Sequence, residues 1–113
     1  MNKRIKDRMH LDFIRALPCC RCGNNVMTEA AHIRYGEPRA GKRPTGMGER
    51  PSDAWVIPLC GECHRLQHSG SEREFWRGSG IDPIFICLAL YRASGDHEAG
   101  EQIISSAQTE VQQ

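Results

Sequence analysis

Four cysteines in two C-x-x-C pairs are the residues of this sequence best suited to chemistry. Cys19 and Cys22 lie in PCCRCG, and Cys60 and Cys63 lie in PLCGECHRLQH. Two such pairs can supply four thiolates to a tetrahedral zinc ion, which would join distant parts of a small chain. Cys20 could replace Cys19 only through a tighter C-x-C arrangement. The spacing therefore predicts a structural Zn²⁺ held by the four paired cysteines.

Three histidines lie close to these pairs in the sequence. His32 occurs in EAAHIRYG, His64 follows the last paired cysteine directly, and His68 comes four residues later. Residues four apart share one face of a helix, the spacing that two histidines need to bind one metal ion. A neutral imidazole can take a proton from water near neutral pH, so His32 is the candidate general base. The alternatives are that His32 only bonds a neighbour and that His68 only caps a helix.

Short elements are expected to position these side chains. Apolar spacing predicts a helix over about 8–17, ended by Pro18. Residues 28–35 alternate as a strand does, with Ala31 and Ile33 toward the core and His32 beside Arg34 on the open face.

A second short strand is expected over 54–58, and a helix from about 60–61 through His68. Three further helices are expected over about 71–78, 82–94 and 96–107. The first of these carries Ser71 and Glu74 in a capping-box pattern. Apolar surroundings make Cys87 a small buried hydrophobe.

Residues 36–53 are rich in glycine and proline and predict neither helix nor strand. A loop of this length in a small domain is usually functional or disordered. Its cations could bind phosphate groups of DNA, together with the strand arginine. The alternative is a solvated loop. The candidate DNA contacts are Arg34, Arg39, Lys42, Arg43 and Arg50, and Arg34, beside His32, is also a candidate catalytic residue.

Composition limits the class of protein. The chain has 113 residues, which predicts one domain over 1–113, and 39% hydrophobic residues, which suits a core assisted by a metal. Residues 1–23 hold six Lys/Arg and two Asp/Glu, whereas residues 69–113 hold three Lys/Arg and seven Asp/Glu. A polyanion would therefore bind to the N-terminal part of the chain. No secretory signal or membrane span is visible, and in the reducing cytoplasm such cysteines indicate metal binding rather than disulfides.

The segment from about Leu11 to Trp76 resembles the HNH nucleases of the zinc-stapled ββα-metal, treble-clef type, in particular short stand-alone forms from phages and prophages. The resemblance rests on PCCRCG, AAHIRYG, PSDAW, PLCGECHRLQH and EREFW. It implies an α+β fold with a β-hairpin and helix around a four-cysteine zinc, flanked by N- and C-terminal helices, the C-terminal extension covering about 77–108. It also implies a DNA endonuclease in the cytoplasm of a bacterial host cell.

In this family one divalent ion stabilises the leaving 3′ oxygen, so the resemblance implies Mg²⁺ or Mn²⁺ bound by His64 and His68, with His32 as the general base. Two positions depart from the family pattern. Ala31 stands where many members have a metal ligand, and the central asparagine is missing. Asp53 is its nearest substitute, either as a metal ligand or as the group that fixes the loop, and His68 or Asp53 would complete the coordination.

Two other functions compete with the nuclease. A non-catalytic zinc module that binds nucleic acid or protein would have the same fold, and it would hold one tight metal ion rather than two. A C-x-x-C redox protein is disfavoured because no thioredoxin-like β-α-β pattern surrounds either pair. The apolar stripe of the C-terminal helices could form a homodimer surface.

Overall fold

The computed structural model describes residues 4–112, and their side chains through residue 108. Two strands and five α-helices make up this part of the chain, which confirms the α+β class. The strands are β1 (Thr28–His32) and β2 (Val56–Cys60). The helices are α1 (Arg8–Arg15), α2 (Gly61–His68), α3 (Glu72–Ser79), α4 (Pro83–Arg92) and α5 (His97–Gln112). No described helix is long and apolar enough to cross a membrane.

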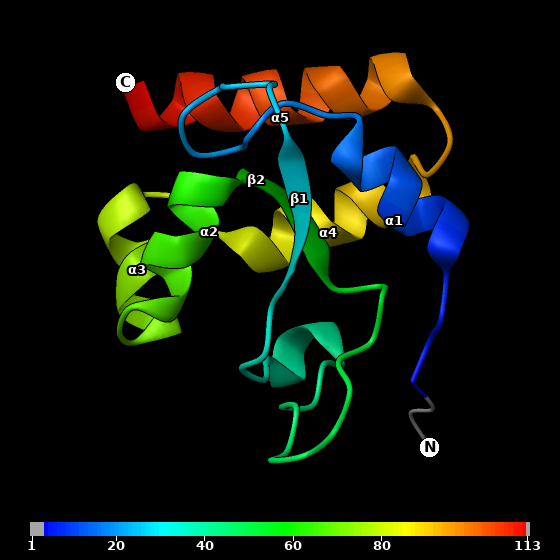
Figure 1. The fold of residues 1–113 in the computed structure, drawn as a ribbon, viewed down its shortest axis with the longest axis vertical. Coiled ribbons are helices and arrows are strands. Elements are labelled where there is room, and N and C mark those ends of the chain that lie inside the picture. The colour runs from blue at the N-terminus through cyan, green and yellow to red at the C-terminus, as the bar shows by residue number, and fades with distance from the viewer. Residues whose placement is uncertain (1–3, 113) are drawn as a thin grey trace.

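The strands form one antiparallel pair at the centre of the molecule (Figure 1). Thr28 lies opposite Cys60, and His32 lies opposite Val56. All five residues of β2 are buried, because α2 and α4 both contact this strand. β1 is shorter than the predicted 28–35: its last ladder contact is the Ile33 N–H to the Trp55 carbonyl at 2.9 Å.

The helices begin and end where capping residues allow. The Asp7 carboxylate accepts the His10 N–H at 2.9 Å and starts α1, which ends before Pro18 and two residues earlier than expected. Ser71 accepts the Glu74 N–H at 3.3 Å and starts α3, which confirms the predicted cap. Gly80, with a φ of 70°, terminates α3 in the left-handed conformation that glycine tolerates best.

The core joins the sheet to the helices at both ends of the chain. Buried residues extend from Phe13 of α1, through Ile57 and Leu90, to Ile104 of α5. Figure 1 shows α5 lying along one side of the molecule, over α1 and the first cysteine turn, and α4 passing behind the strands. Gly100 permits this close approach: a Cβ added there would lie 2.9 Å from atoms of both Leu17 and Phe13.

The long connection between β1 and β2 has more order than the sequence indicated. It contains a short 3₁₀ turn, η1 (Pro38–Ala40), and an isolated bridge between Glu37 and Lys42. The Lys42 side chain is buried, and its ammonium group donates to the Tyr35 carbonyl. The loop therefore closes on itself by internal bonds.

The N-terminal segment 4–7 fixes the far end of this connection. Arg4 Nε donates to the Pro51 carbonyl at 3.0 Å, and the Ile5 N–H donates to Ser52 Oγ at 3.2 Å. The Asp53 N–H donates in turn to the Ile5 carbonyl at 2.8 Å. Residues about 47 positions apart in sequence therefore hold Asp53 in one place.

Candidate functional site

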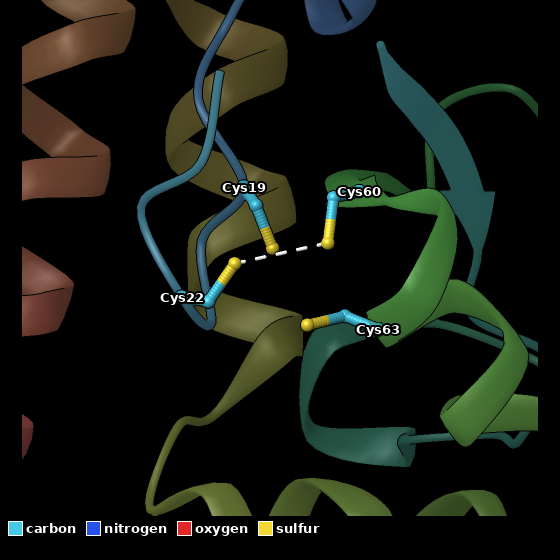
Figure 2. Close-up of side chains that lie close together, drawn as sticks. All are labelled: Cys19, Cys22, Cys60 and Cys63. Atoms are coloured by element: carbon cyan, nitrogen blue, oxygen red, sulfur yellow. Dashed lines mark hydrogen bonds between the residues drawn. The ribbon is translucent and has the colours of Figure 1, made fainter. Parts of the chain in front are cut away.

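The four paired cysteines converge as the sequence predicted. Their sulfur atoms all lie within 4.8 Å of one another, and the Cys22 and Cys60 sulfurs are 3.7 Å apart. Figure 2 shows the side chains of Cys19 and Cys22, from the turn after α1, pointing toward those of Cys60 and Cys63. Four convergent thiols are the donor set of a structural zinc site, so this cluster fits a bound Zn²⁺.

Local backbone geometry builds each half of the cluster. In the first half, the Gly23 N–H donates to the Cys19 carbonyl at 2.8 Å, and Gly23 has a φ of 82° that suits glycine. The Cys20 N–H donates to the Pro58 carbonyl at 2.9 Å and so ties this turn to β2. In the second half, Cys60 is the N-cap of α2, and Cys63, the other cysteine of this pair, lies in the first turn of the helix.

The surroundings of the Cys63 sulfur act in two opposite directions on the thiolate that a metal would bind. Burial raises the pKa of the Cys63 thiol to about 12, so a free thiol there would stay protonated. Arg21 Nη1 lies 3.4 Å from the Cys63 sulfur and donates to it, which stabilises the thiolate that a metal needs. Arg21 was not among the predicted site residues, although its position inside the first C-x-x-C pair is a signal for such a role.

The other two cysteines lie outside the cluster. Cys20 and Cys87 are fully buried, and burial raises the pKa of both thiols. The Cys87 sulfur donates to the Val56 carbonyl at 3.2 Å. Cys87 is therefore a buried core residue, as predicted, and Cys19 rather than Cys20 occupies the cluster.

His32, at the end of β1, pairs with Asp53. His32 Nε2 lies 3.0 Å from Asp53 Oδ1, and the two side chains are 26% and 8% exposed. The second carboxylate oxygen, Oδ2, accepts the Asp7 N–H at 2.9 Å. Burial acts to raise the pKa of the Asp53 carboxyl, but the hydrogen bonds from His32 and Asp7 outweigh it, and the pKa lies below its usual value.

The ionised carboxylate fixes the tautomer of the His32 ring. A carboxylate only accepts hydrogen bonds, so His32 Nε2 must carry the hydrogen that bonds Asp53. In the neutral ring the other nitrogen, Nδ1, then holds a free lone pair. His32 is thus arranged to accept a proton at Nδ1, and Asp53 is the residue that orients it.

His64 and His68 lie on one face of α2, with ring centroids 4.9 Å apart. His64 Nδ1 also lies 2.6 Å from Glu29 Oε1 of β1. Glu29 was not predicted as a site residue; it is an exposed residue of β1, two positions before Ala31, which stands where many members of the resembled family have a metal ligand. Among residues 4–108, the four cysteines are the one set of three or more metal-binding side chains that converge. Asp53 therefore contacts His32, and Glu29 contacts His64 of the α2 histidine pair.

The predicted DNA-contacting cations differ in their partners. Arg39 pairs with Glu37 at 3.0 Å, and Arg43 pairs with Glu49 at 2.7 Å. Burial lowers the pKa of Lys42, whose ammonium is directed inward. The two remaining cations, Arg34 and Arg50, are exposed, and their side chains form no ion pair within residues 4–108.

These features define a small α+β protein with a four-cysteine cluster that could hold a metal ion and with a carboxylate–histidine pair. Residues 1–93 match the family described as Protein of unknown function (DUF968). The match covers most of the chain, so the protein belongs to this family. Neither a curated protein nor a solved structure matches the chain. The family match ends just after α4, which leaves α5 beyond it.

Proposed function

We propose that this protein is a metal-dependent endonuclease of the HNH type that hydrolyses phosphodiester bonds of DNA. The observation that carries the proposal is the His32–Asp53 pair, which leaves one imidazole nitrogen free to accept a proton at the end of β1. The order of elements also agrees with a treble-clef arrangement: a cysteine turn, two antiparallel strands, and a helix that supplies the last cysteine.

In the proposed reaction His32 Nδ1 takes a proton from water as the water oxygen bonds to phosphorus. The bond from phosphorus to the 3′ oxygen breaks, and solvent protonates that oxygen. Asp53 keeps the imidazole in the required tautomer and stabilises the positive charge that forms on it. A divalent ion such as Mg²⁺ or Mn²⁺, when bound, would stabilise the charge on the leaving oxygen.

Glu29, His64 and His68 are the side chains that would hold this divalent ion, and they would have to move closer together to do so, because their ligand atoms do not converge in the structure. Ala31 offers no ligand atom, so a third donor must come from elsewhere. Glu29 already contacts His64 Nδ1 at 2.6 Å, and a cation could replace the proton that this contact shares. Two imidazoles and a carboxylate form a donor set that several first-row divalent metals accept. Glu29 would thus add a carboxylate to His64 and His68, where the sequence had led us to expect that His68 or Asp53 completes the coordination.

The test is cleavage of supercoiled plasmid, single-stranded DNA and branched DNA by the zinc-loaded protein with Mg²⁺ or Mn²⁺. We expect nicking that EDTA abolishes and that Glu29→Gln weakens more than Glu62→Gln. Glu62 is an exposed carboxylate on α2 and is the matched control. Cleavage that persists in EDTA, or equal activity of the two variants, would contradict the assignment of the ion to this site.

A non-catalytic zinc module is the second candidate, and Ala31 is the observation that favours it. Metal content separates the two functions. A nuclease holds one tightly bound zinc and one weaker divalent ion, and the weaker ion is absent from Glu29→Gln. A binding module holds the zinc alone. Equilibrium dialysis against Mn²⁺, followed by metal analysis, distinguishes these results.

A further inference from the structure

A cavity of about 250 Å³ lies between the N-terminal segment and the long connection of the sheet. Arg4 and Ile5 line it from the N-terminal side, and residues 41–45, 49, 50, 52 and 55 line it from the connection. Ile33, the residue after His32, completes the wall. Binding sites for drug-sized ligands are about 300–1,000 Å³, so this cavity suits a smaller group such as a single nucleotide phosphate with its sugar.

The lining of this cavity is strongly basic. It carries four cationic side chains against one carboxylate, Glu49. Glu49 neutralises Arg43, and Lys42 is held by backbone carbonyls. Arg4 bonds the Pro51 carbonyl through Nε alone, and Arg50 forms no ion pair within residues 4–108. Two guanidinium groups therefore remain to bind an anion, and planar guanidinium groups bind phosphate with two hydrogen bonds.

The cavity adjoins the proposed catalytic pair along the chain. Ile33 follows His32 directly, and Ser52, another lining residue, precedes Asp53 directly. The charge of Arg4 also reaches Asp53. Burial has the largest effect on the pKa of that carboxyl and raises it, and the hydrogen bonds from His32 and Asp7 lower it. The charge of Arg4 makes a smaller contribution, which also lowers the pKa. An anion held by Arg4 would thus lie within electrostatic reach of the pair.

We propose that this cavity binds one phosphate of a DNA strand, through Arg4 and Arg50, beside the phosphate that is cleaved at His32. The proposal rests on the proposed nuclease function and names its substrate more closely. A space for one nucleotide unit admits a single strand more readily than a duplex. The cavity would therefore hold a strand that is already unpaired at this position, and it would set the distance between the bound and the cleaved phosphate.

The experiment measures binding of a fluorescent single-stranded oligonucleotide by anisotropy at several salt concentrations. The protein is the full chain with zinc bound and with His32→Ala, so that no cleavage occurs. Removal of one cation that binds a phosphate should reduce the slope of log affinity against log salt by about 0.7. We expect this reduction for Arg50→Gln and for Arg4→Gln, and recovery of the slope in Arg50→Lys. Arg77→Gln is the matched control, because Arg77 is 73% exposed and lies on α3 outside the cavity.

Unchanged slopes for both Arg50→Gln and Arg4→Gln would overturn the proposal, whether or not the wild-type protein nicks plasmid. Reduced slopes for the two variants, together with no nicking by the wild-type protein, would support phosphate binding in the cavity and would contradict the proposed nuclease activity. A deoxynucleoside monophosphate serves as competitor. If it binds in an Arg50-dependent manner while oligonucleotide binding does not depend on Arg50, the cavity is a site for free nucleotides, and the DNA proposal is wrong.

Discussion

Asp53→Asn tests how the carboxylate controls His32. Asp53 Oδ2 accepts the Asp7 N–H at 2.9 Å, and Asp53 Oδ1 faces His32 Nε2 at 3.0 Å. The amide of the variant must turn its oxygen toward the Asp7 N–H, because an NH₂ group cannot accept that bond. Its NH₂ group then faces His32 Nε2 and requires a lone pair there. The hydrogen of the neutral ring moves to Nδ1, which can then no longer accept a proton.

The expected reduction in rate is large because general base catalysis contributes about 10²–10⁴ in rate. We expect plasmid nicking by Asp53→Asn to slow by about this factor while zinc content and helical circular dichroism stay as in the wild type. Asp12→Asn, on the exposed side of α1, is the control for removal of one carboxylate and should cleave normally. Nitrogen-15 NMR of the imidazole reports the tautomer directly. An Nε2–H tautomer in the variant, or nicking within twofold of the wild type, would refute the reasoning.

Three further predictions concern stability. Removal of zinc by a strong chelator should abolish most of the helical circular dichroism signal. Zinc binding supplies about 10–16 kcal/mol in small zinc domains, which equals or exceeds the usual free energy of unfolding of a domain, about 5–15 kcal/mol. Retained helicity would show that the core folds without metal. In urea unfolding, Gly100→Ala should be less stable by about 1–3 kcal/mol, because its methyl group would lie 2.9 Å from two buried side chains. Gly78→Ala, with no atom within 4 Å of the added methyl, should gain about 0.5–1 kcal/mol, and equal effects of the two variants would contradict the packing of α5. Burial lowers the pKa of His10 from 6.5, against smaller opposing effects of Asp7 and Asp53, so the unfolded state takes up a proton more readily than the folded state. The free energy of unfolding should therefore fall as pH drops from about 7 through 6.5 toward the lowered pKa, and His10→Asn should remove this component; a pH dependence identical in wild type and variant would disprove it.

The cysteine cluster could be predicted from the sequence because each C-x-x-C pair is set by local geometry. Cys19 and Cys22 lie in one tight turn, and Cys60 and Cys63 lie at the start of one helix. Zinc chemistry then requires that the two pairs meet. The helices were predicted for a similar reason, since Ser71 and the other caps act on their own neighbours.

The partners of the histidines were harder to predict because they depend on tertiary contacts. Asp53 was expected to act as a metal ligand or to fix the loop, and it bonds His32 because Ile5 and Asp7 hold it there. Glu29 meets His64 only when α2 packs on β1. Lys42 was predicted to contact DNA, but the bonds that close the loop bury it. Side-chain type and spacing do not reveal any of these three contacts.

The measurement that tests the central claim most directly is plasmid nicking by His32→Ala beside His97→Ala. His97 is an exposed histidine of α5, paired with Glu101, and it is the matched control for removal of one imidazole. Purified wild-type protein and His97→Ala should nick supercoiled DNA in Mg²⁺ or Mn²⁺ at the same rate, and His32→Ala should be slower by about 10²–10⁴. Nicking by His32→Ala at the wild-type rate, or no cleavage of any DNA form by the wild type, would contradict the account.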